Sequence, residues 1–211
     1  PARVVSLVVS DVPGDEPAQV ASGPTVPDPS NRQSALQYIK GYGIELPHRL
    51  LHHLNTSPDD TPDPSDPVYA QNSVSVIASA ALSLDGAASV AGAAGLTPVI
   101  LSDAIEGEAK DVGMVHAAIA REVRERNRPF GAPTVILSGG ETTVTIRDTV
   151  GRGGRNSEFL LAFAGGIESA SITAMAADTE GIGGSAPKAG DFENGETSER
   201  LRSGGNEKRA L

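Results

Sequence analysis

The sequence predicts an α/β protein with a mostly parallel, mixed, Rossmann-like sheet that is flanked by helices. Short β-branched apolar runs alternate along the chain with stretches of helical periodicity, which is the pattern of strands joined by helical crossovers. The chain has 4 Phe, 3 Tyr and no Trp, so Val, Ile, Leu and Ala must build its core. The expected strands are residues 4–9, 73–78, 97–101, 134–137, 142–146 and 171–177.

The first part of the chain, residues 1–54, begins with a buried strand over 4–9 that ends at an acidic turn. A helix over 32–41 follows, for which Ser30 is a candidate N-cap, and Pro47 can open a second helix that ends near Leu54. Residues 55–71 hold Pro58, Pro62, Pro64 and Pro67 among several aspartates. Since this composition disfavours packed elements, we expect a linker there.

Residues 72–211 are expected to form a second α/β domain. Helices are predicted over 80–94, 107–127 and 156–165, between the strands. The segments 134–137 and 142–146 are joined too tightly for a helical crossover, so the sequence predicts a β-hairpin near 134–146. After about residue 184 the chain is Gly-rich and charged, and we expect a mobile tail.

The composition excludes several classes of protein. The net charge of −10 disfavours a nucleic-acid-binding surface, and no apolar run reaches the roughly 18 residues that span a bilayer. Without cysteine there are no disulfides, thiolate nucleophiles or Cys-ligated zinc. The composition fits a reducing compartment, and we expect a cytoplasmic protein.

Small and acidic residues follow four of the expected strands, for example Ser10-Asp11 after residue 9, Ser138-Gly139-Gly140-Glu141 after 137, and Asp178-Thr179 after 177. The carboxyl ends of parallel strands share one edge of a sheet, where ligands of open α/β proteins bind. Converged carboxylates there hold Mg²⁺ or handle a substrate proton. The alternative is that Asp, Ser and Gly only serve the turns.

A glycine-rich loop, Gly151-Arg152-Gly153-Gly154-Arg155-Asn156, lies between a strand and a helix. Its glycines and the N-terminus of the helix suit an anion, to which the arginines add donors. It is not a dinucleotide fingerprint, because Asn156 stands in the third glycine position, and it has no Gly-Lys-Ser/Thr. A flexible turn with exposed arginines is the alternative.

His48 and His52 are four residues apart on one helix but lack a zinc motif.

The segments that carry these residues resemble the class II glycerate kinases, whose second domain is the MOFRL domain. Residues 10–17, 21–25 and 28–29 resemble the end of that family's first domain, residues 138–145 and 151–158 look like the MOFRL signature, and 177–182 look like its third motif. The resemblance reaches almost the whole chain up to about residue 190.

The resemblance implies ATP-dependent phosphorylation of D-glycerate, most often at the 2-hydroxyl, with Mg²⁺, in a cleft between two α/β domains. It implies catalytic roles for Asp11, Asp15 and Arg155, and magnesium ligation by Asp178 and Glu141. The residues that it implies bind substrate or nucleotide are Ser22, Gly23, Ser138, Gly139, Gly140, Glu141, Thr142, Gly153, Gly154 and Asn156.

The sequence also departs from the family. Most of the expected N-terminal domain, including a Gly-Lys motif, has no counterpart ahead of Pro1, and Glu180 and Gly183 replace two aspartates of the third motif. We therefore expect an internal or C-terminal fragment that is a poor catalyst without its upstream domain. A homodimer is a further expectation. A non-catalytic ligand-binding remnant is the main alternative, and a hydroxypyruvate reductase is a third reading.

Overall fold

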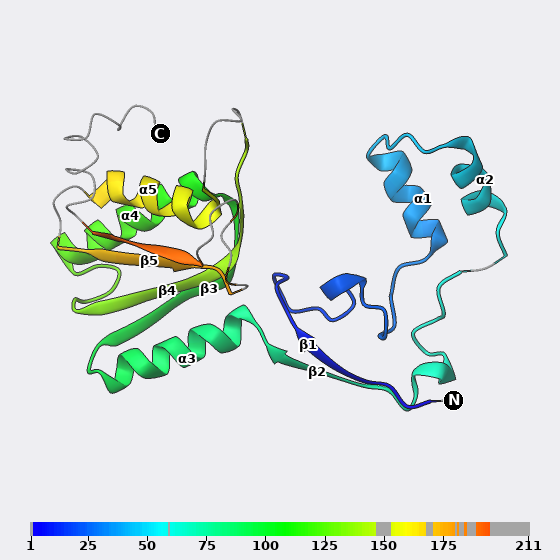
Figure 1. Ribbon diagram of the computed structural model, residues 1–211, viewed down its shortest axis with the longest axis horizontal. Coiled ribbons are helices and arrows are strands. Elements are labelled where there is room, and N and C mark those ends of the chain that lie inside the picture. The colour runs from blue at the N-terminus through cyan, green and yellow to red at the C-terminus, as the bar shows by residue number, and fades with distance from the viewer. Residues whose placement is uncertain are drawn as a thin grey trace. The chain divides into compact units, whose positions relative to one another are not determined.

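The computed structural model describes residues 2–58, 60–146, 153–167, 171–179, 181, 184 and 189–194. The chain divides into two compact units, residues 1–79 and 80–211 (Figure 1). Among the described residues, no helix combines the length and the apolar character that crossing a bilayer requires.

The first unit is built on a parallel pair of strands, β1 (Val5–Val9) and β2 (Ser73–Ala78). Between them the chain forms a 3-10 turn η1 (Val20–Ser22), helices α1 (Arg32–Gly41) and α2 (His48–Thr56), and a second 3-10 turn η2 (Pro67–Tyr69). Helix α1 begins where the sequence predicts, but its N-cap is Asn31 rather than Ser30. The Asn31 side chain accepts from the Ser34 N–H, and the Ser34 hydroxyl accepts from the Asn31 N–H.

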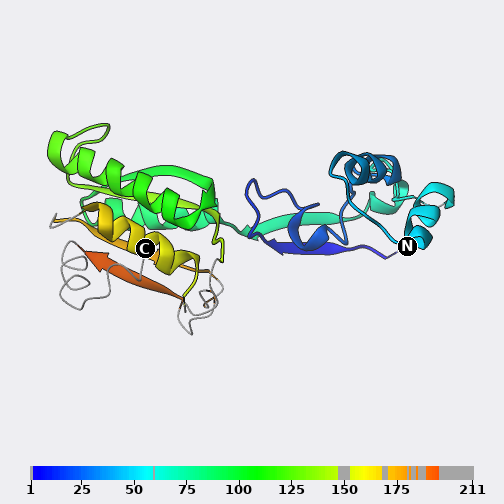
Figure 2. The same ribbon diagram turned by 90° about the horizontal axis from the view of Figure 1, so that it is seen from above.

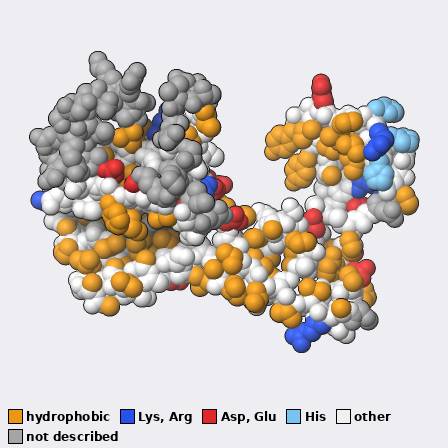
Figure 3. Space-filling view, viewed as in Figure 1, with side chains coloured by type: hydrophobic (Ala, Val, Ile, Leu, Met, Phe, Trp, Pro, Cys, Tyr) orange, Lys and Arg blue, Asp and Glu red, His pale blue; other side chains and the backbone are white. Residues whose placement is uncertain are grey.

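The core of the first unit is small. Val26 is its one buried apolar residue among those described, whereas Val5, Leu7 and Val9 are 60–66% exposed. Parallel strands are normally covered on both faces, so this pair has more apolar surface open than a complete α/β sheet would leave. Hydrophobic side chains are also visible over α1 in Figure 3, with the histidines of α2 beside them.

The second unit is a parallel pair, β3 (Thr97–Glu108) and β4 (Thr134–Thr143), with helices on both faces. Helix α3 (Ala80–Ala93) lies on one face, where it meets Gly139. Helix α4 (Ala109–Arg126) lies on the other face, where His116 meets Ser138, as the alternation of side chains along a strand requires. An antiparallel pair, β5 (Thr173–Ala177) and β6 (Gly190–Asn194), completes this unit.

Helix α5 (Arg155–Ile167) packs beside α4, and the two are seen next to each other in Figures 1 and 2. The largest fully buried side chains among the described residues, Leu160 and Ile167, belong to α5. Close approach of the helices depends on small residues. A Cβ on Gly113 would lie 2.4 Å from the Phe159 carbonyl oxygen, and one on Gly166 would lie 2.5 Å from the Ala117 Cβ.

The predicted fold class is confirmed: parallel strand pairs are flanked by helices, and one pair is antiparallel. The predicted hairpin near 134–146 is wrong. Residues 134–143 form one strand, in which Glu141 and Thr142 stay paired in parallel with Glu106 and Gly107. The antiparallel pair is β5 with β6, and residues 190–194, which the sequence analysis places in a mobile tail, form β6.

Gly140 explains why the chain does not reverse. Its φ is +144°, and a Cβ there would lie 2.1 Å from the carbonyl oxygen of Ile105. The register of β3 and β4 shifts on either side of Ser102, so the extra residues are absorbed by an irregularity in β3. Gly139 and Gly140 thus belong to a bulged parallel strand pair rather than to a turn.

Candidate functional site

Arg155 lies at the first position of α5 and joins two carboxylates from different strands. Its Nη1 pairs with Glu141 Oε1 of β4, and its Nη2 donates to Asp178 Oδ2, directly after β5, at 3.1 Å. The side chain of Asp178 is only 6% exposed, while those of Arg155 and Glu141 are 33% and 42% exposed. The structure therefore brings together three of the predicted site residues in one charged cluster with a nearly buried carboxylate.

The fit of this cluster to a metal ion is poor. Two carboxylates with waters and phosphates are a common Mg²⁺ donor set, but here one guanidinium bridges both. Among the described residues, no group of three or more His, Cys, Asp or Glu side chains is placed to hold a metal. Magnesium ligation by Glu141 and Asp178 stays a prediction, and no step is derived through it.

The glycines before α5 are packed closely against another part of the backbone. Gly153 has φ +153°, and a Cβ on Gly184 would lie 2.5 Å from the Gly153 carbonyl oxygen. The Gly154 carbonyl accepts from the Glu158 N–H at 3.0 Å, which begins the helix. Gly151 and Arg152 of the predicted loop lie outside the described residues.

Asn156, beside Arg155, has a buried side-chain Nδ2 without a hydrogen-bond partner among the described atoms. A buried amide that lacks a partner is unusual, because leaving a donor unsatisfied is unfavourable. The next residue, Ser157, donates its hydroxyl to Asp191 Oδ2 of β6 at 3.3 Å. The first turn of α5 thus combines a salt-bridged arginine with a buried amide donor that has no partner among the described atoms.

Ser138 of β4 is hydrogen-bonded to His116 of α4, a residue without a predicted site role. Its Oγ lies 3.0 Å from Nε2 of His116, whose Nδ1 lies 2.8 Å from the Val112 carbonyl oxygen. The His116 and Phe159 rings are arranged edge to face, with 5.2 Å between ring centroids. In the sequence, Val112, Val115 and Ile119 repeat at helical spacing and indicate a packed face that leaves out His116, although Val115 is 58% exposed. The small-residue spacing Ala109, Gly113, Ala117 marks the packed face and puts His116 beside it.

Gly139 and Thr142 are held within the strand ladder. A Cβ on Gly139 would lie 3.3 Å from Ala80 Cβ of α3, and Thr142 pairs with Gly107. The packing of β4 accounts for Gly139 without a ligand. A role for either residue in binding stays a prediction.

The remaining predicted residues lie in the first unit, on the loop that follows β1. Asp11 and Ser22 are exposed and Asp15 is half-buried. Asp15, Ser22 and Gly23 have φ of +54°, +62° and +51°. A Cβ on Gly23 would lie 2.6 Å from the Ala18 carbonyl oxygen, so the loop is tightly folded there. The structure gathers these four residues on one loop of their own unit.

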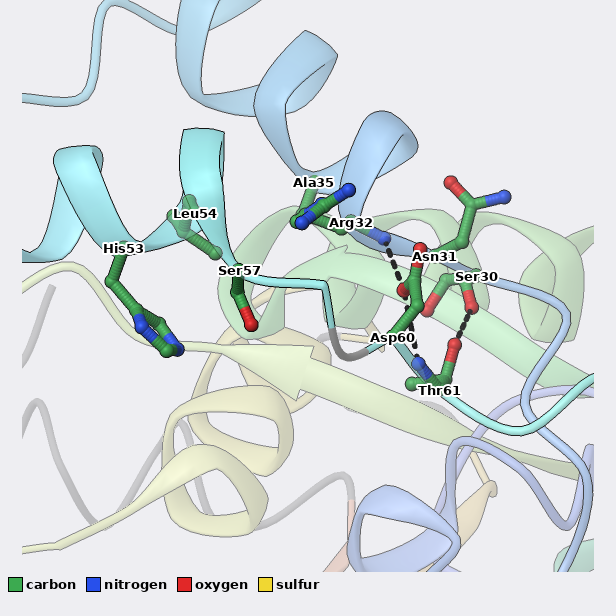
Figure 4. Close-up of a pocket in the computed structure, with 9 residues that line it drawn as sticks. All are labelled: Ser30, Asn31, Arg32, Ala35, His53, Leu54, Ser57, Asp60 and Thr61. Carbon is green, nitrogen blue, oxygen red and sulfur yellow. Dashed lines mark hydrogen bonds between the residues drawn. The ribbon is translucent and has the colours of Figure 1, made fainter.

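The first unit also holds a shallow cavity of about 440 Å³ that no predicted site residue lines. Figure 4 shows the Asp60 carboxylate accepting from the backbone N–H groups of Arg32 and Thr61, both within 2.9 Å. The Arg32 Nη1 is buried and has no partner among the described atoms. The cavity residues are Ser30, Asn31, Arg32, Ala35, His53, Leu54, Ser57, Asp60 and Thr61.

Comparison with known families matches both ends of the chain. Residues 134–211 match the MOFRL family, and residues 1–55 match a domain of unknown function, DUF4147. The Glu141–Arg155–Asp178 cluster lies wholly within the MOFRL match.

Curated relatives have two different names. A protein of Agrobacterium vitis named "Putative hydroxypyruvate reductase" is 44% identical over all of this chain and 48% of its own length. The "Glycerate 2-kinase" of Pyrococcus horikoshii is 34% identical, over 95% of this chain and 46% of its own length. The "D-glycerate 2-kinase" of Thermotoga maritima is 33% identical, over 97% and 48%. The chain spans about half the length of the curated relatives that it matches.

Solved structures agree with these relatives. The crystal structure of a Thermotoga maritima glycerate kinase matches 97% of this chain and 48% of its own, with a TM-score of 0.82 and 32% identity. A Pyrococcus horikoshii protein matches 98% and 50%, with a TM-score of 0.76 and 33% identity. The predicted resemblance to the glycerate kinases with a MOFRL domain is confirmed.

Proposed function

We propose that this chain, which carries MOFRL and DUF4147 sequence and resembles the glycerate kinases, supplies about half of an ATP-dependent kinase that phosphorylates D-glycerate. One observation carries the proposal. The MOFRL-matching segments bring Arg155 and two carboxylates together at the start of a helix, in a chain whose relatives include glycerate 2-kinases. ATP is the phosphate donor that such a kinase uses.

Arg155 is the residue that would stabilise the transferred phosphoryl group. Phosphoryl transfer depends mainly on positioning and on neutralising charge, and a guanidinium supplies several donors in a fixed plane. Asp178 and Glu141 hold that plane from two sides, so the donors are oriented before a ligand arrives. The two carboxylates are thus proposed as supports for Arg155.

The first turn of α5 would bind further phosphate oxygens. The backbone N–H groups at the N-terminus of α5 are proposed to bind an anion, together with the buried amide donor of Asn156, which has no partner among the described atoms. Ser138, Gly139, Gly140 and Thr142 are proposed to line the nucleotide or substrate side of the same region. Mg²⁺, where bound, would add charge neutralisation for the phosphates.

The loop after β1 would contribute the acid–base chemistry. Asp11 or Asp15 is proposed to take the proton from the glycerate hydroxyl, since a carboxylate within hydrogen-bond reach is the usual general base for an alcohol. Ser22 and Gly23 would contact the substrate through a loop held in left-handed backbone conformations. We propose a remnant of the first kinase domain over residues 1–54, a linker over 55–71 and a MOFRL-type domain over 72–211. A cytoplasmic location and a homodimer are further proposals.

A coupled assay tests the kinase. The chain is mixed with a polypeptide carrying the remaining half of the Agrobacterium vitis relative, and ADP release is measured with D-glycerate and ATP–Mg²⁺. We expect release only with both halves, and 2-phosphoglycerate as the product by NMR. Arg155→Met should lower kcat at least about a hundredfold, as for other donors to a transition-state charge, and Arg121→Met should not. No turnover by a folded mixture would contradict the proposal.

The names of the two 44% identical relatives favour a second candidate, a hydroxypyruvate reductase. It requires a nicotinamide cofactor, for which residues 151–156 lack the third glycine of the fingerprint. A change in NADH or NADPH fluorescence on mixing with the chain, followed by oxidation of that cofactor when hydroxypyruvate is added, would establish the reductase. A non-catalytic remnant, the main alternative from the sequence, would bind ATP or glycerate in calorimetry without releasing ADP.

A further inference from the structure

The hydrogen bonds of His116 define which of its ring nitrogens carries the proton. Nδ1 lies 2.8 Å from the Val112 carbonyl oxygen, and a carbonyl only accepts. The proton of the neutral ring must therefore be on Nδ1. The other nitrogen, Nε2, then has only a lone pair to offer.

This tautomer determines the polarity of the Ser138 hydroxyl. Ser138 Oγ lies 3.0 Å from Nε2, which can only accept, so the hydroxyl must donate its proton to His116. What Ser138 keeps for any other partner is its two oxygen lone pairs. Because Ser138 is exposed, these lone pairs are accessible to a ligand.

Ser138 and His116 are linked to the charged cluster through α5. Phe159, which faces the His116 ring, follows Arg155 by four residues and so lies on the same face of the helix. Glu141, the partner of Arg155, is three residues beyond Ser138 on β4. Ser138 is thus linked to the proposed phosphoryl-binding arginine through His116 and Phe159 and, along β4, through Glu141.

We propose that Ser138 accepts a hydrogen bond from a ligand hydroxyl, and that His116 is the positioning residue that sets this polarity. The inference rests on the proposed function, in which both substrates bear hydroxyls: D-glycerate and the ribose of ATP. A phosphate oxygen needs a donor, which Ser138 does not offer while His116 is neutral. Arg155 and the first turn of α5 therefore recognise the phosphate, whereas Ser138 selects a ligand that carries a hydroxyl group.

The first test measures the tautomer without any ligand or activity. Long-range proton–nitrogen NMR at about pH 8, where an ordinary histidine is neutral, separates the two tautomers of each ring. The His116 signal is identified by its loss in His116→Gln, and His48, His52 and His53 serve as internal references. We expect a protonated Nδ1 for His116. A protonated Nε2 would overturn the proposal, because Ser138 would then be free to donate to a phosphate.

The second test asks which hydroxyl Ser138 recognises. Calorimetry on the two-half mixture compares D-glycerate with 3-hydroxypropionate and D-lactate, which each lack one hydroxyl, and adenosine with its 2′- and 3′-deoxy forms. Ser138→Ala should weaken one hydroxyl-bearing ligand about five- to tenfold, while the matching deoxy analogue is unaffected. Equal losses for both, or no binding of either parent compound, would overturn the ligand assignment.

The last comparison isolates His116. In His116→Gln the side-chain carbonyl oxygen of glutamine can still accept from Ser138 Oγ, whereas phenylalanine in His116→Phe can pack on Phe159 but cannot accept. We expect His116→Phe to weaken only the ligand identified with Ser138→Ala, about threefold, and His116→Gln to restore it. Equal affinities for the two variants would contradict a positioning role. Failure of phosphoryl transfer alone would refute the kinase and leave these binding results standing.

Discussion

Arg155 donates from Nη2 to Asp178 Oδ2 at 3.1 Å, and only 6% of the Asp178 side chain is exposed. A carboxylate so far removed from water is stable as an anion only with compensating donors. Arg155 comes from the start of α5 and Asp178 from the end of β5, so this pair ties two elements of the second unit together at the candidate site. The same contact that is proposed to orient Arg155 for a ligand also supports the fold.

Replacing Arg155 by Met should therefore lower the free energy of unfolding of the second unit. We expect a loss of about 1–2 kcal/mol, below the value for fully buried pairs because Arg155 is 33% exposed. Urea unfolding followed by circular dichroism measures the change. Arg121→Met, on the exposed face of α4, is the control and should change little. Adding Asp178→Asn to Arg155→Met should recover stability; a further loss would show that the anion is compensated elsewhere.

Two neighbouring glycines of α5 should respond to alanine in opposite directions. A Cβ on Gly166 would lie 2.5 Å from Ala117 Cβ of α4, whereas nothing lies within 4 Å of a Cβ on Gly165. Gly166→Ala should reduce the unfolding free energy by about 1–3 kcal/mol through overpacking. Gly165→Ala should raise it by about 0.5–1 kcal/mol through helix propensity. Equal effects in thermal unfolding would mean that α4 and α5 do not approach this closely.

Much of the secondary structure could be predicted from periodicity. The helices over 32–41 and 109–126 are found within two residues of their expected bounds, because each has long, regular spacing and a clear end. Strand β6 could not be predicted because Gly190, Asp191 and Asn194 have low β propensity, and pairing with β5 determines their conformation. The parallel course of Gly139–Thr143 also depends on a tertiary contact, the close approach of Gly140 to Ile105.

The candidate site, too, could be predicted only in part from the sequence. Polar residues at strand and helix ends indicated Glu141, Arg155 and Asp178, and the structure brings them into contact. Spacing alone could not tell that an arginine, rather than a cation, would lie between the two carboxylates. His116 could not be predicted because the helical spacing of the valines indicates a different packed face, whereas the small residues form the packed face of α4.

Glu108 should make the second unit sensitive to acid. Hydrogen bonds from the Thr145 hydroxyl and backbone N–H, at 2.6 and 3.1 Å, hold the pKa of Glu108 below its ordinary value. A lowered pKa in the folded state stabilises the fold above the unfolded pKa, and this stabilisation is lost as the pH falls through the folded pKa. Thr145→Val should raise the pKa of Glu108 toward its ordinary value, as measured by NMR titration of the carboxyl carbon.

Thr134→Val is the matched control for that titration. The Thr134 hydroxyl donates to the Thr97 carbonyl at 2.7 Å and contacts no carboxylate that the structure describes, so its removal should leave the pKa of Glu108 unchanged. A shift of equal size in both variants would assign the effect to general loosening of β4. An unchanged pKa in Thr145→Val would show that the hydroxyl does not hold Glu108.

The cap of α1 should be worth a measurable part of the stability of the first unit. The Asn31 side chain accepts from the Ser34 N–H at 2.9 Å, and the Ser34 hydroxyl oxygen accepts from the Asn31 N–H at 2.9 Å. Asn31→Ala should lower the unfolding free energy by about 1 kcal/mol, and Ser30→Ala should have little effect because Ser30 lies outside the cap. All 3 tyrosines, Tyr38, Tyr42 and Tyr69, lie in residues 1–79, so tyrosine fluorescence during urea unfolding reports this unit alone. A larger loss of unfolding free energy for Ser30→Ala than for Asn31→Ala would show that Ser30 is the N-cap, as the sequence predicts.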